Sequence, residues 1–92
     1  MAVQIATVNA TRGVGPDSVP AKRGVDSVQW NGPPNRFTIH FLAVPSPVGV
    51  NDFSVPSGAL QVQETATEGK NYYEVRNISS GVVMADPDVD VE

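Results

Sequence analysis

Hydrophobic and polar positions alternate in short runs along this chain, and no stretch of helical length shows a clean 3.6-residue period. The clearest alternation covers residues 36–42, where Phe37, Ile39 and Phe41 share one face and Thr38 and His40 share the other. A period of two is typical of a strand with one buried face. Prolines recur between positions 16 and 56 and would interrupt most helices there. The pattern therefore predicts strands throughout.

Seven strands are expected, separated by turns rich in glycine and proline. Besides residues 36–42, they cover residues 3–8, Ser18–Ala21, 25–30, 59–65, 72–78 and 86–92. Ser18–Ala21 contains a proline and is expected at a sheet edge at best. Short strands at this spacing indicate a single all-β domain over residues 1–92, an antiparallel β-sandwich of about seven strands.

The same pattern predicts which side chains form the core. Tyr73 and Val75 are expected to point inward from residues 72–78, and Trp30 is expected at the centre of the sandwich. In the last strand the acidic residues alternate with valines, which predicts a solvated acidic face. Residues 43–57 hold three prolines and a glycine and are predicted as a long loop with at most one helical turn.

Composition excludes several kinds of chemistry. The chain has 92 residues, no cysteine and a single histidine, His40. Without cysteine there is no disulfide, no thiol nucleophile and no thiolate ligand for zinc, iron–sulfur or type 1 copper centres. No Gly-x-Ser-x-Gly motif accompanies the histidine, so a hydrolase is the least expected class. We therefore predict a non-enzymatic protein with no catalytic residues and no cofactor.

The charge distribution narrows the range of partners. The net charge is −4; residues 1–40 hold four basic and two acidic residues, and residues 41–92 hold two basic and eight acidic residues. No basic run is present, which argues against nucleic acid and against anionic membrane surfaces as partners. The N-terminus lacks the features of a secretory signal, so a cytoplasmic protein and an exported domain whose signal was removed both stay open.

From Val25 onward, four motifs occur in an order that resembles the cupredoxin family, the sandwich fold of plastocyanin and azurin. They are VQWN at 28–31, FTIHF at 37–41, Gly69 followed by YYEV at 72–75, and DPDVDV at 86–91. This resemblance implies a cupredoxin-like sandwich, and an immunoglobulin-like one is the alternative.

The resemblance also implies where copper ligands would lie. The first copper histidine falls on Phe37, the cysteine falls near Asn77, and no second histidine follows. Met84 lies in the stretch of the axial methionine, but a thioether alone binds Cu(II) feebly. The resemblance therefore implies a copper-free member of the family.

These observations favour a module that binds another protein or assembles with itself as a homo-oligomer. The loop over residues 43–57 is the expected contact segment, with Asp52 and Phe53 at its tip. The alternative is weak metal or small-molecule binding by His40 with nearby carboxylates.

Overall fold

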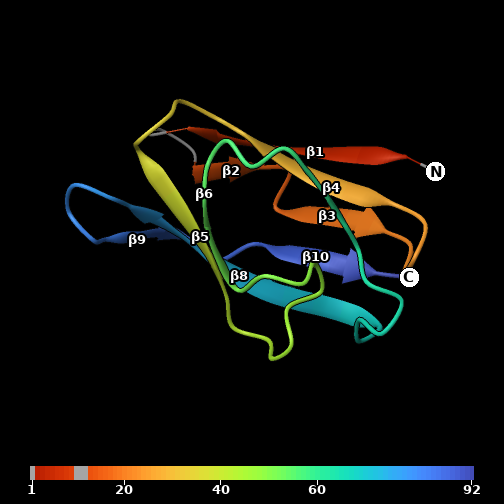
Figure 1. Cartoon of the computed structure of the whole chain (residues 1–92). Coiled ribbons are helices and arrows are strands. Elements are labelled where there is room, and N and C mark those ends of the chain that lie inside the picture. Colours follow the sequence, from red (N-terminus) through yellow and green to blue (C-terminus); the bar gives the residue numbers. More distant parts are fainter. Residues whose placement is uncertain (1, 10–12) are drawn as a thin grey trace.

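A computed structural model describes residues 2–9 and 13–92, which form an all-β domain (Figure 1). Within these residues no helix is present, and hence none that could cross a membrane. The described strands are β1 (Val3–Asn9), β2 (Gly13–Gly15), β3 (Ser18–Ala21), β4 (Ser27–Asn31), β5 (Phe37–Phe41), β6 (Asp52–Ser54), β7 (Ala59–Gln61), β8 (Gly69–Asn77), β9 (Val83–Ala85) and β10 (Asp88–Val91).

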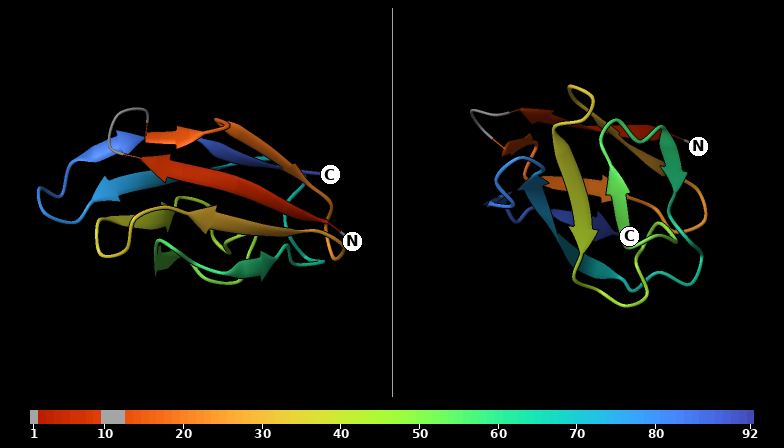
Figure 2. Two further views of the ribbon diagram at one scale, coloured as in Figure 1. Left: turned by 90° about the horizontal axis from the view of Figure 1, so that it is seen from above. Right: turned by 60° about the vertical axis from the view of Figure 1, so that its left-hand side comes forward.

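The strands form two sheets packed as a sandwich (Figures 1 and 2). One sheet has the order β2-β1-β4-β7, and the other has the order β3-β10-β8-β5-β6 with β9 beside β8. β1 begins and β10 ends at the same end of the molecule (Figure 2). The predicted sandwich is confirmed at this level, and all seven predicted strands are present.

The predicted antiparallel pairing is wrong in two places, and the strand number is too low. β1 pairs with β4 in parallel, and β3 pairs with β10 in parallel. Both pairs join strands that are not consecutive in sequence, and the hydrophobic alternation reports the buried face of a strand but not the direction of its neighbour. The three missed strands, β2, β6 and β9, have three residues each, too few to show a period.

Trp30 lies at the centre of the core, as predicted, with no exposed surface. It projects from β4 of the four-stranded sheet against three rings of the other sheet. Its ring centroid lies 5.1 Å from that of Phe53, 5.5 Å from that of Tyr73 and 5.9 Å from that of Phe41, all in edge-to-face geometry. Each such pair contributes about 0.5–1.5 kcal/mol beyond the burial of its area. The two sheets therefore meet around one indole.

The inward faces of the two central strands of the larger sheet agree with the predicted pattern. Phe37, Ile39 and Phe41 on β5 and Tyr73 and Val75 on β8 are all buried. In β5 the alternate residues Thr38 and His40 are half-buried on the opposite face of the sheet. The alternation in the sequence thus fixed the orientation of these strands correctly.

Two carboxylates are buried, and one of them departs from the predicted solvated acidic face. Asp88 on β10 is only 7% exposed, because the Ser18 hydroxyl of neighbouring β3 donates to its Oδ1 at 2.7 Å. Asp26 accepts hydrogen bonds from the backbone N–H groups of Lys22 at 2.9 Å and Ala2 at 3.1 Å. The Lys22 hydrogen bond is the main cause that holds the pKa of Asp26 below its usual value. Both carboxylates join segments distant in the chain.

The core also encloses two polar atoms that have no hydrogen-bond partner among the described residues, Trp30 Nε1 and Tyr73 Oη. Burial is the main cause that raises the pKa of Tyr73 to about 12; the Trp30 side chain acts in the opposite direction, and the carboxylates of Asp88 and Asp17 act with burial. An unpartnered buried hydroxyl costs about 1–3 kcal/mol relative to one that is satisfied. We therefore expect Tyr73 to stabilise the core mainly through its ring.

Tyr73→Phe is expected to leave the free energy of unfolding at pH 7 unchanged or to raise it by about 1 kcal/mol, because only an unpartnered hydroxyl is lost. The phenol ionises near pH 10 in the unfolded chain but near pH 12 in the folded one, so the wild type loses stability as pH rises through this window. The loss approaches about 2–3 kcal/mol, at 1.36 kcal/mol per pKa unit.

Urea unfolding at pH 7, 10 and 11.5 measures both effects. Tyr73→Phe should lack this part of the alkaline loss, whereas Tyr72→Phe, at an exposed position on the same strand, should retain it. A Tyr73→Phe protein destabilised by more than about 1 kcal/mol at pH 7 would show that the hydroxyl group has a stabilising partner.

Candidate functional site

The segment expected to be one long loop, residues 43–57, contains strand β6, and this places the two predicted contact residues differently. Asp52 and Phe53 are not at a loop tip, because β6 pairs antiparallel with β5, with Ile39 opposite Phe53 and His40 opposite Asp52. The Phe53 ring lies against Trp30 in the core. Phe53 is therefore a packing residue, and the predicted tip is wrong.

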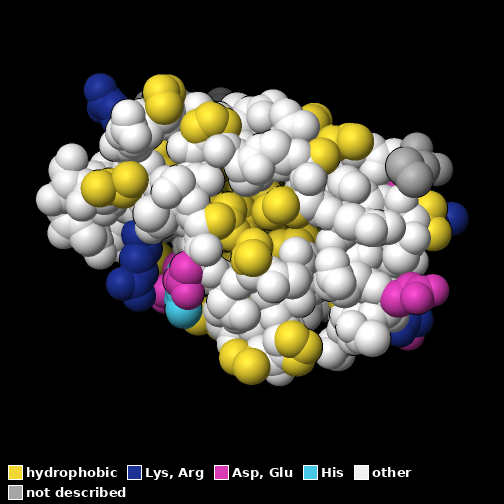
Figure 3. All heavy atoms as spheres, in the orientation of Figure 1, with side chains coloured by type: hydrophobic (Ala, Val, Ile, Leu, Met, Phe, Trp, Pro, Cys, Tyr) yellow, Lys and Arg dark blue, Asp and Glu magenta, His cyan; other side chains and the backbone are white. Residues whose placement is uncertain are grey.

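The loop proper covers residues 42–51 and carries no charged side chain. Val44 is 88% exposed, and Leu42 and Val50 are also exposed. Tyr72 on β8 lies beside this loop, because its carbonyl accepts the N–H of Leu42 at 3.1 Å, and its side chain is exposed too. Figure 3 shows apolar side chains at the lower edge of the molecule, where this loop lies in Figure 1. We call Leu42, Val44, Val50 and Tyr72 the apolar tip.

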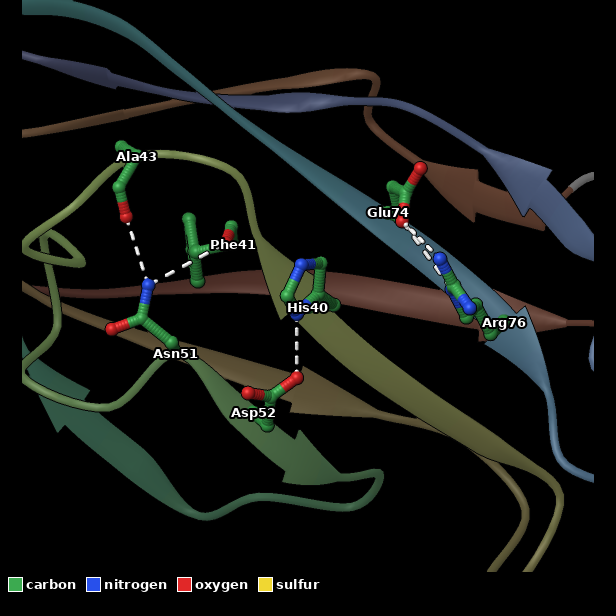
Figure 4. A network of polar contacts seen from close by, with 7 residues as sticks. All are labelled: His40, Phe41, Ala43, Asn51, Asp52, Glu74 and Arg76. Atoms are coloured by element: carbon green, nitrogen blue, oxygen red, sulfur yellow. Dashed lines mark hydrogen bonds and ion pairs between the residues drawn. The ribbon is translucent and has the colours of Figure 1, made fainter.

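Asn51 closes the base of this loop (Figure 4). Its side-chain Nδ2 donates to the carbonyl of Ala43 at 2.8 Å and, more weakly, to that of Phe41 at 3.4 Å. Its own backbone carbonyl accepts the N–H of Phe41 at 2.8 Å. One side chain thus satisfies backbone groups on the strand that enters the loop, while the main chain continues the ladder between β5 and β6.

The middle of the loop is anchored as well. Val48 is 5% exposed and belongs to the core, and its N–H is within 3.2 Å of the Ser46 hydroxyl oxygen that accepts it. The carbonyl of Pro47 accepts the N–H of Gln63, beyond β7, at 2.8 Å. Because the loop is held at its base and its middle, the apolar tip projects from a backbone with a defined conformation.

Exposed apolar side chains on an ordered backbone are suited to protein recognition. A single exposed aliphatic residue is ordinary, but several together with a tyrosine are typical of binding surfaces. Ordering a loop in advance lowers the entropy lost on association. The sequence alone does not distinguish the exposed Val44 and Val50 from the buried Val48, because all three lie in the same apolar, proline-rich stretch.

His40 lies on the outer face of the larger sheet, between Asp52 on β6 and Glu74 on β8. Its Nδ1 lies 2.5 Å from Oδ1 of Asp52, and the two side chains are 40% and 73% exposed (Figure 4). Glu74 is turned to Arg76, whose Nη2 donates to it at 2.8 Å. Across residues 2–9 and 13–92, no group of three His, Cys, Asp or Glu side chains could hold a metal ion. This row consists of a surface hydrogen bond between His40 and Asp52 and a surface ion pair between Arg76 and Glu74.

His40 does not line any of three hollows found on the surface of the described residues. Their volumes are about 270, 360 and 380 Å³. The smallest is lined by Asp17 and by residues 85–88, and the largest by residues 14–17. These hollows are on strands and turns remote from β5 in sequence.

The positions at which the resemblance to cupredoxins implies copper ligands do lie near one another. Phe37 on β5 is directly opposite Asn77 on β8, and Met84 lies on β9, which pairs with β8 beside that point. Phe37 is fully buried and Met84 packs against the core. A phenyl ring has no donor atom, and an amide and a thioether are poor substitutes for thiolate and imidazole. The residues present do not fit a type 1 copper ion.

No protein-family model matches this sequence, and no curated protein matches it.

Asn51→Ala is expected to lower the free energy of unfolding by about 1–2 kcal/mol, because the carbonyl groups of Ala43 and Phe41, which are part-buried, lose a donor. Asn51→Asp keeps the size of the side chain but removes the donor, and should cost at least as much at pH 7. Urea unfolding of both variants against the wild type measures this. An Asn51→Asp protein as stable as the wild type would contradict the anchoring role of the amide.

Proposed function

We propose that this protein is a non-enzymatic binding module that contacts another protein through the apolar tip on the loop over residues 42–51. One observation supports this proposal: apolar side chains are exposed on a loop whose backbone is held in place. Leu42, Val44 and Val50 are exposed, while Asn51 and Val48 fix the backbone that carries them. Exposed apolar side chains on a fixed loop lose little entropy on binding and gain the burial of their surface.

The chemistry of the loop supports binding over catalysis. None of its side chains is ionisable, and its one hydroxyl group, on Ser46, is 3% exposed and accepts the N–H of Val48. General acid–base or nucleophilic catalysis needs an ionisable group or an activated, reachable hydroxyl. The loop over residues 42–51 offers neither. Tyr72 at its margin carries a phenol, and His40 and Asp52 on the same sheet are hydrogen-bonded to each other.

The partner is identified by its chemistry as a protein surface with an apolar depression. Tyr72 adds an aromatic ring at the margin of the tip, and tyrosine is enriched among residues that dominate binding energy. Arg76 and Glu74 lie farther along the outer face of β8 and provide a polar margin. An apolar centre with a polar rim is the usual anatomy of a protein–protein interface.

The scaffold of this module is proposed to be cupredoxin-like and copper-free. Support comes from the order of the four motifs and from the proximity of Phe37, Asn77 and the β9 strand with Met84. In this interpretation an apolar side chain, Phe37, fills the position of a metal ligand, and the space near it belongs to the core. The scaffold then acts through its surface and loops.

Val44→Asp is the most direct test, because it places a charge at the most exposed apolar position of the tip. Val82→Asp is the matched control, since Val82 is also an exposed valine, 59% exposed, in the turn between β8 and β9. Immobilised wild type and Val82→Asp should retain the same partner from an extract of the source cells, and Val44→Asp should not.

Calorimetry with the purified partner then gives the magnitude. Loss of a residue that dominates an interface costs about 2 kcal/mol or more, and a buried charge at Val44 is expected to be at least as costly, so the Kd for Val44→Asp should rise by roughly 30-fold or more. Equal affinity of all three proteins for the partner would remove the loop from the interface. Thermal unfolding of each variant checks that the fold is intact.

A further inference from the structure

The outer face of the four-stranded sheet differs in charge from the outer face of the larger sheet. Its register sets the outward residues in rows across the strands: Val3 beside Ser27 and Gln61, Ile5 beside Gln29 and Ala59, and Thr7 beside Gly15 and Asn31. None of these side chains is charged. We call this set of nine residues the uncharged face.

The opposite outer face shows the contrast. Outward positions of the larger sheet include Lys70, Glu74 and Arg76 on β8 and Asp88 and Asp90 on β10. Asp52 and His40 lie on the same face. The charged residues of the strands are thus gathered on one side of the sandwich, in a chain whose net charge is −4.

The uncharged face also holds exposed apolar surface. Val3 is 49% exposed and Ile5 is 43% exposed, on alternate positions of β1. Polar side chains in the rows beside them are amides and hydroxyls, and Gln29 Nε2 already donates to Asn31 Oδ1 at 2.8 Å. The face therefore combines an aliphatic strip on β1 with an amide-rich strip on β4.

We infer that two copies of this chain associate through the uncharged face, packed sheet against sheet about a two-fold axis. In a two-fold contact the same patch of both copies meets. Charged residues in such a patch would repel their symmetry mates, and uncharged residues would not. Amides and hydroxyls both donate and accept hydrogen bonds, so Gln29, Gln61 and Ser27 can pair with their own symmetry mates. A charged partner would find no opposite charge on this face.

A dimer contact of ordinary size would use a modest share of the surface. The molecule exposes 5013 Å² in all. A standard interface buries about 800 Å² on each partner, roughly a sixth of that surface. Sheet-on-sheet packing would draw this area from one outer face of the sandwich. The apolar tip at residues 42–51 is a separate surface, so this inference does not depend on the proposed function.

Sedimentation velocity of the full chain over a range of concentrations tests this inference. The wild type should move from monomer to a species of twice the mass as concentration rises, with little change when salt is increased, because no charges meet at the contact. Ile5→Lys and Gln29→Glu each place like charges against each other across the axis and should raise the dimer dissociation constant at least tenfold. Gln29→Glu keeps the size of the side chain, so it reports on charge even if Ile5→Lys folds poorly.

Val83→Lys on β9 is the matched control, since Val83 is 40% exposed on a strand of the other sheet, and it should dimerise as the wild type does. Val44→Asp should also dimerise normally, which separates this contact from the apolar tip. A wild type that stays monomeric at millimolar concentration overturns the inference. So does a dimer that both Ile5→Lys and Gln29→Glu leave intact, or one that only Val44→Asp or Val83→Lys dissociates.

Discussion

The packing of Trp30 against Phe41, Phe53 and Tyr73 holds the two sheets together, and the rest of the structure depends on it. The indole comes from β4 of one sheet, and the three rings come from β5, β6 and β8 of the other. The chain after β5 returns antiparallel to it as strand β6, and this brings Phe53 into contact with the indole. This return fixes the length of the loop that carries the apolar tip.

The loop and the core are thus parts of one arrangement. Residues 42–51 connect two neighbouring strands whose aromatic residues meet the same tryptophan, and Val48 extends the core into the loop itself. Asn51 then satisfies carbonyl groups that would otherwise face the interior of the loop. The side chains of the loop that take no part in this packing and hydrogen bonding are the exposed ones. The defined conformation of the loop follows from the packing of the core beneath it.

Much of the fold was predictable, because period-two alternation reports which face of a strand is buried. It oriented β5 and β8 correctly and placed Trp30 in the core. Pairing direction was not predictable, since β1 with β4 and β3 with β10 are contacts between distant segments. The segment predicted as a loop, residues 43–57, does contain one, but Phe53 lies on β6 and packs against Trp30, and the most exposed apolar side chain is Val44. Asp88 was misplaced because its partner, Ser18, is 70 residues away in sequence.

The central claim is that the loop over residues 42–51 has a defined conformation before any partner binds. Amide hydrogen exchange of the free protein, followed residue by residue by NMR, tests it most directly. The N–H groups of Val48 and Gln63, which donate to the Ser46 hydroxyl oxygen and to the Pro47 carbonyl of the loop, should exchange far more slowly than unprotected amides. Exchange of both at the rate of an unstructured chain, while the strand amides stay protected, would contradict the account.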